Sequence, residues 1–178
     1  HLKSVYGKEF DSEEFLRKLF NLTLKIPKLL DLELDKYILE KLKETGIPEF
    51  DNPDIAFVIM QGFRDNPREI VQFINSLIGY YQLARVRDLT SVLDNLPFLA
   101  KILVIRQKWP VKYSEIEGII LRSGVNLEEA IDRIADQKKN DRELRELREF
   151  VNHKTPTITS TTVDPFFALS ISEYEEKL

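Results

Sequence analysis

The chain has 178 residues and a net charge of −4, and that balance does not by itself recruit nucleic acid. It contains no cysteine, which excludes a disulfide scaffold and any metal site built on thiolates. Glycine and proline are scarce, at 6 and 8 residues, which argues against collagen-like, linker-like and turn-dense all-β chains. The longest run without a charge, residues 70–84, is too short and too polar to span a bilayer. With no signal-peptide pattern at the N-terminus, these features predict a cytoplasmic protein, or a cytoplasmic piece of a larger one, without a membrane segment.

Taken in chain order, apolar residues recur at helical spacing almost throughout. The pattern predicts helices over residues 12–21, 31–45, 55–60, 67–85, 97–109, 113–121, 127–135 and 144–151, with a last one beginning near 172. The segments 127–135 and 144–151 are either two consecutive helices or one kinked helix. Only residues 22–26 alternate as a strand does. The sequence therefore predicts an all-α multi-helix bundle with at most a short strand or hairpin.

Capping residues locate several of the predicted helix starts. Asp54 precedes a very apolar segment, and Asn66 precedes Pro67, which suits the first helical position. Two further capping boxes are predicted, Asn126 with Glu129 and Asn140 with Glu143. We expect the helix over 67–85 to be central and heavily buried. We divide the chain into a helical bundle, a helical extension and a polar connector that leads into a last helix, over residues 10–124, 125–153 and 154–178.

The sequence holds no complete catalytic motif. A glycine-rich loop ending in Lys-Ser/Thr and a G-x-G-x-x-G turn are both missing. His153 stands alone in a charged segment and is interpreted as a solvated residue at a helix end. We therefore assign no catalytic residue, no metal ligand and no cofactor to this chain.

One basic stretch allows two interpretations. Its four cations are Lys101, Arg106, Lys108 and Lys112. In a nucleic-acid-binding surface the cations would contact phosphates, while Trp109 and Tyr113 would stack on bases. In the other interpretation Trp109 belongs to the core and the cations form the exposed side of one helix. We favour the second, because four charges fall short of a dedicated patch.

Three stretches in order resemble the C-terminal part of the KAP family of P-loop NTPases. They are EFLRKLFNLTLKIP (14–27), DNPREIVQFINSL (65–77) and LAKILVIRQKWPVKY (99–113). The resemblance covers about residues 10–120. It implies that this chain is the helical lid of an ATPase whose ATP- and Mg²⁺-binding core, with the Walker A and B motifs, precedes it. By the same implication the chain alone is not an enzyme.

The resemblance also implies a role for Arg68, in the helix that Asn66 and Pro67 begin. In such lids an arginine reaches the phosphates of the nucleotide when the lid closes, and a guanidinium suits this by its permanent charge and forked donors. The alternative is that Arg68 only pairs with a local acid, Asp65 or Glu69. A different function also stays open, that of a stand-alone helical module that binds protein partners. Nucleic-acid binding through the four cations is the third hypothesis.

Overall fold

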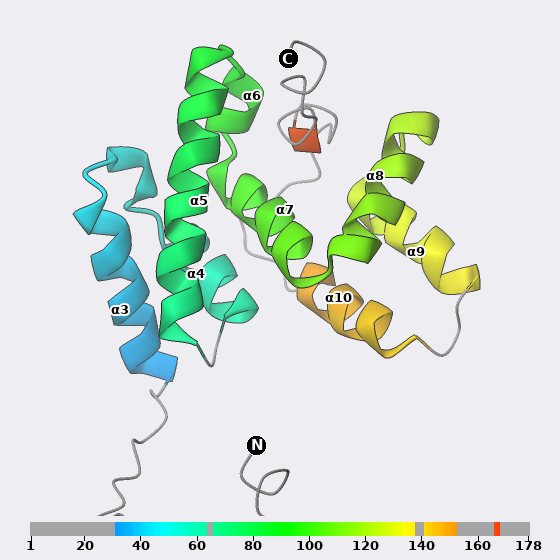
Figure 1. Ribbon diagram of the computed structural model, residues 1–178, viewed down its shortest axis with the longest axis horizontal. Coiled ribbons are helices and arrows are strands. Elements are labelled where there is room, and N and C mark those ends of the chain that lie inside the picture. Colours follow the sequence, from blue (N-terminus) through cyan, green and yellow to red (C-terminus); the bar gives the residue numbers. More distant parts are fainter. Residues whose placement is uncertain (1–30, 64–65, 138–140, 153–165, 168–178) are drawn as a thin grey trace, which may run out of the picture.

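The computed structural model describes residues 31–63, 66–137, 141–152 and 166–167, and Figure 1 shows their arrangement. Over these residues the chain is helical and has no strand, which confirms the predicted all-α multi-helix bundle. The long elements are α3 (Asp31–Glu44), α4 (Pro53–Gly62), α5 (Pro67–Val86), α7 (Leu96–Lys108), α8 (Pro110–Ser123), α9 (Leu127–Gln137) and α10 (Arg142–Asn152). Two short ones are the 3-10 turn η1 (Pro48–Phe50) and α6 (Thr90–Leu93). The predicted helices at 12–21 and from 172, the strand-like residues 22–26, and residues 153–165 lie outside the described part.

The helix α7, and not α5, is the centre of the bundle. Every residue from Leu96 to Ile105 is buried, and Figure 1 places α7 between α3–α5 on one side and α8–α10 on the other. By contrast α5 buries one stripe and turns the opposite side to solvent. The expectation of a central α5 was wrong because its uncharged run includes exposed amides and hydroxyls, Gln72, Asn75, Ser76 and Gln82. An uncharged segment is not necessarily an apolar one.

The start of α5 is the one that the sequence predicted best. The side-chain oxygen of Asn66 accepts hydrogen bonds from the backbone N–H groups of Arg68 and Glu69, at 3.2 and 3.4 Å. Pro67 occupies the first helical position, where a missing N–H costs nothing. The cap of α9 is also confirmed, because the Glu129 N–H donates to Asn126 at 2.8 Å.

Two other predicted caps are each displaced along the chain. α4 is capped by Asn52, whose side chain accepts from the Asp54 N–H at 2.8 Å, so Asp54 lies inside the helix. α10 begins after Asp141, whose carboxylate accepts from the Leu144 N–H at 3.2 Å. In both cases a neighbouring residue of the same capping type takes the role.

A single residue joins α7 to α8. The Trp109 N–H donates to the Ile105 carbonyl at 2.9 Å, and the Trp109 carbonyl accepts from the Tyr113 N–H at 2.8 Å. Trp109 therefore ends one helix and caps the next. The sequence predicted a start at Tyr113, but Pro110 opens α8 because proline suits the first helical turn.

The tightest approach between helices occurs where α4 meets α7. A Cβ atom placed on Gly62 would lie 2.7 Å from a methyl carbon of Val104, which is closer than real Cβ contacts allow. Gly62 thus lets the end of α4 rest against α7. The buried apolar side chains of α3 through α10, together with Phe166 and Phe167, form one continuous core.

Candidate functional site

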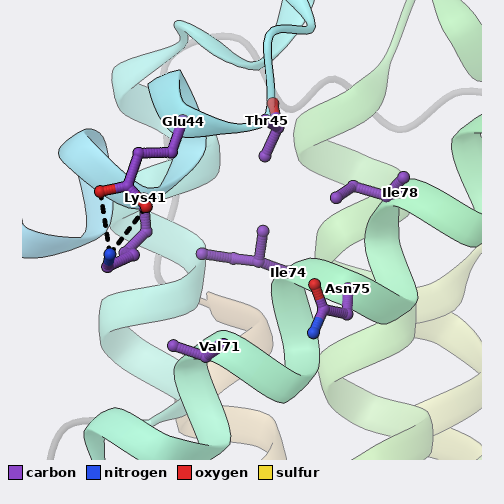
Figure 2. Close-up of a pocket in the computed structure, with 7 residues that line it drawn as sticks. All are labelled: Lys41, Glu44, Thr45, Val71, Ile74, Asn75 and Ile78. Atoms are coloured by element: carbon purple, nitrogen blue, oxygen red, sulfur yellow. Dashed lines mark hydrogen bonds and ion pairs between the residues drawn. The ribbon is translucent and has the colours of Figure 1, made fainter.

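An open groove lies between the end of α3 and the middle of α5. Its volume is about 240 Å³. The lining residues, drawn in Figure 2, are Lys41, Glu44, Thr45, Val71, Ile74, Asn75 and Ile78. We call this the α3–α5 groove.

The floor of the groove is aliphatic and belongs to α5. Val71, Ile74 and Ile78 follow one another at steps of three and four, so they form one stripe on that helix. Val71 remains 36% exposed, although it is a large apolar residue. Ile74 is buried at 4% exposure and Ile78 is half-buried, so Val71 is the exposed part of the floor. α3 ends at Glu44, and the chain turns at Gly46, whose φ of +69° is one that glycine adopts easily. The longer α5 continues beyond that point.

The rim of the groove is polar. The Lys41 ammonium donates to both carboxylate oxygens of Glu44, at 2.8 and 2.7 Å, and this hydrogen bonding raises the pKa of Lys41. The Thr45 hydroxyl donates to the Leu42 carbonyl at 2.6 Å. Asn75 adds an exposed amide for which the described residues supply no hydrogen-bond partner. A bound segment would therefore meet apolar side chains below and hydrogen-bonding groups at the edge.

Arg68 lies on the same side of α5, one turn before Val71. Its side chain is exposed, and no ion pair joins it to another residue in the described part of the chain. The Glu69 carboxylate, one of the two acids considered as its partner, accepts a hydrogen bond from the Asn66 amide at 2.7 Å instead. Asp65, the other acid considered, lies outside the described residues.

The start of α5 is a poor anion site apart from Arg68 itself. Two backbone N–H groups of its first turn already donate to Asn66. The negative charge of Glu69 is also held at this helix end, where it would repel a phosphate. Any anion at this place would thus depend on the guanidinium alone.

The four cations of the basic stretch do not form an exposed face. Lys101 and Lys112 are buried, at 4% and 6% exposure. Arg106 donates to the hydroxyl of Tyr80, and Lys108 donates to the Gly62 carbonyl. Both sequence interpretations had placed all four cations at the surface, which is wrong for Lys101 and Lys112, whereas Lys108 is exposed and Arg106 is half-buried. The charged end of each of the four nevertheless donates a hydrogen bond to another part of the chain.

The two buried lysines connect α7 and α8 to α10. The Lys101 ammonium donates to the Val151 carbonyl at 2.6 Å, in the last turn of α10, and burial lowers the pKa of Lys101 to about 8. Lys112 forms an ion pair with Asp141 at the start of α10. The hydrogen bond between them raises the pKa of Lys112 and lowers that of Asp141. Trp109 packs against the core, with its ring centroid 5.7 Å from that of Phe150.

A second, smaller hollow of about 60 Å³ lies between α9 and α10. The exposed pair of Arg148 and Asp132, 2.9 Å apart, spans it. Among the described residues no group of three or more histidine, cysteine, aspartate or glutamate side chains is placed to hold a metal ion. Nor does any helix in the described ranges have the length and apolarity to cross a membrane.

Comparisons with protein-family models, with curated proteins and with solved structures find no match to this chain. The likeness to KAP-family lids therefore depends on the three sequence stretches alone. No residue role can be transferred from a relative, so the function has to be argued from the site itself.

Sequence reasoning missed the α3–α5 groove, although one signal for it is present. Val71 and Ile78 make the apolar surface of α5 wider than a single core-facing stripe requires. The sequence predicted where α3 ends, but it could not show where that end would lie against α5. Of the predicted site residues, only Arg68 lies beside the groove.

Proposed function

We propose that this chain is a helical protein-interaction domain and that the α3–α5 groove receives its partner. The observation that carries the proposal is an aliphatic floor left open between two helices, with Val71 exposed. The volume of the groove, about 240 Å³, lies below the roughly 300–1,000 Å³ of pockets for drug-sized ligands. The space suits one or two side chains of a peptide better than a whole cofactor.

The partner that fits is an amphipathic helix with aliphatic anchors and an acidic residue. Val71 and Ile78 are two turns apart, about 10 Å along α5, which suits anchors about seven residues apart on a partner helix. Arg68, exposed beside Val71, would meet the acid. Asn75 would bind a polar group at the edge of the contact.

A library of helical peptides displayed on phage tests the proposal against the purified chain. Selected peptides should share two aliphatic or aromatic residues about seven positions apart, followed or preceded by an acid. Replacing Val71 with Gln should weaken the best peptide at least about tenfold, because a buried anchor loses its apolar contact. Isothermal titration calorimetry gives the affinities.

Val86→Gln is the matched control. Val86 is on the same helix and 84% exposed, but it does not line the groove. Glutamine is uncharged, so the helix dipole affects neither variant. Peptides that fail to enrich, or that bind both variants equally, would rule out the groove as the binding site.

The KAP-like lid is the second candidate, favoured by the exposure of Arg68 in the first turn of α5. In that role the lid would close over ATP and Mg²⁺ held by the P-loop core, with Arg68 directed at the phosphates. On this proposal the isolated chain shows no ATP turnover and no tight ATP binding by calorimetry. Robust hydrolysis by the purified chain would contradict it.

A further inference from the structure

The two helices that border the α3–α5 groove run in the same direction. Figure 1 shows α3, in blue, and α5, in green, both rising from the lower edge of the bundle to its upper edge. The residues that line the groove come from the end of α3 and the first half of α5. A helix bound along the groove would therefore be either parallel to both neighbours or antiparallel to both.

The electrical charge beside the groove differs between its two ends. Arg68, exposed in the first turn of α5, supplies a positive charge at one end, and no ion pair within the described ranges neutralises it. The other end, near Thr45, lies where α3 stops, and the C-terminal end of a helix carries partial negative charge (Figure 2). The charged lining residues, Lys41 and Glu44, pair with each other at 2.7 Å. The groove therefore has a positive end and a weakly negative end.

We propose, on the basis of the proposed function, that the partner helix binds antiparallel to α3 and α5 and carries its acidic residue after its second aliphatic anchor. In this direction the negative C-terminal end of the partner lies over Arg68, and its positive N-terminal end lies beside the end of α3. In the parallel direction each end would face charge of its own sign. Because Arg68 precedes Val71 by three residues, the acid follows the second anchor by three or four positions.

Two synthetic peptides of about 16 residues test the direction against the full chain. The first is an alanine–glutamine helix with two leucines seven positions apart and a glutamate three positions after the second leucine, and the other is the same sequence reversed. A hydrocarbon staple on the outer side makes both equally helical. The first peptide should bind at least about threefold more tightly, because only it brings the acid and the negative helix end to Arg68 together. Isothermal titration calorimetry gives both affinities.

Arg68→Gln should remove the difference between the two peptides, because this variant lacks the positive charge at the end of the groove. Arg145→Gln is the matched control. Arg145 is also an exposed arginine near the start of a helix, but it belongs to α10, on the other side of α7 (Figure 1). This control should keep the full preference for the first peptide. Val71→Gln should weaken both peptides, because either direction uses the same floor.

Disulfide cross-linking reports the direction independently of affinity. The chain has no cysteine, so one introduced cysteine gives a single reaction site. Gln72 and Gln82 are both exposed on α5, the first near Arg68 and the second beyond Ile78, about 15 Å apart along the helix. A cysteine joined through one glycine to the C-terminus of the first peptide should react with Gln72→Cys. The same cysteine at the N-terminus of that peptide should react with Gln82→Cys.

The outcomes separate this proposal from the proposed function. Equal affinities for the two peptides would overturn the antiparallel direction. A C-terminal cysteine that reacts faster with Gln82→Cys, or equally with both variants, would do the same. In each of these cases, binding that still depends on Val71 leaves the groove as the partner site. If neither peptide shows binding that depends on Val71, both proposals are wrong.

Discussion

Lys101 is a charged side chain enclosed by α7 and α10. Its ammonium binds the Val151 carbonyl, which satisfies one of the backbone acceptors left free at the end of α10. Burial penalises the charged form and lowers the pKa to about 8. The folded state therefore releases this proton at a lower pH than the unfolded chain, in which the ordinary pKa is 10.5.

The free energy of unfolding should consequently rise between pH 8 and pH 10.5, where only the unfolded chain binds the proton. The difference of about 2.5 pKa units corresponds to a rise of up to about 3 kcal/mol. Lys101→Met should lack this rise, whereas Lys36→Met, which removes an exposed ammonium of α3, should retain it. Urea denaturation across this range measures the effect. Parallel profiles for the intact chain and Lys101→Met would contradict it.

Gly62 provides a second test at the scale of one residue. Gly62→Ala should lower the free energy of unfolding by about 1–3 kcal/mol, because the new methyl group meets Val104 in a closely packed core. Val104→Ala in the same chain should make the glycine substitution less costly. Gly79→Ala is the control: it lies within α5 with no atom near its Cβ position, and alanine there should add up to about 1 kcal/mol. Equal effects at both glycines, measured by thermal unfolding, would argue against the close approach.

Among the elements, α10 depends most on a single residue at its start. One oxygen of Asp141 caps the helix through the Leu144 N–H, and the other pairs with Lys112 of α8. Asp141 therefore begins α10 and also attaches this helix to α8. The capping signal was visible in the sequence, but the choice between Asn140 and Asp141 was not, because it depends on a lysine 29 residues away.

Asp141→Asn should loosen α10 while leaving its cap in place, since asparagine caps as well as aspartate does. Lys112, buried at 6% exposure, would lose its counter-ion. Amide hydrogen exchange in α10 should accelerate and the thermal midpoint should fall at pH 7. Because the pair lowers the pKa of Asp141, its contribution is full above the ordinary value of 3.8 and is lost as the pH falls through the lowered pKa. The two chains should thus converge in strong acid.

Glu146→Gln is the comparison for that experiment. It breaks an exposed pair with Arg142, 2.8 Å apart on the surface of the same helix. Such pairs contribute little, so exchange in α10 should hardly change. If Glu146→Gln and Asp141→Asn behaved alike, the attachment would not depend on Lys112.

Over the described part of the molecule, the sequence predicted the long helices and missed η1, α6 and the arrangement of the bundle. Features that depend on neighbouring residues could be predicted from the sequence. They are the apolar stripes of α3, α5, α9 and α10 and the caps at Asn66 and Asn126. The central place of α7, the burial of Lys101 and the open floor beside Val71 each depend on contacts between distant segments. Among the residues in and beside the α3–α5 groove, only Arg68 was predicted from the sequence to be a site residue.

The connection at Trp109 fixes the orientation of the helices that follow it, α8–α10, relative to those that precede it, α3–α7. Because one residue ends α7 and caps α8, there is no loop to absorb a change in length. One added residue at this position would rotate everything after it by about 100° around the helix axis. The Val151 carbonyl would then turn away from Lys101, and Phe166 would turn away from Phe98. The number of residues between the two helices is therefore as constrained as the identity of any buried side chain.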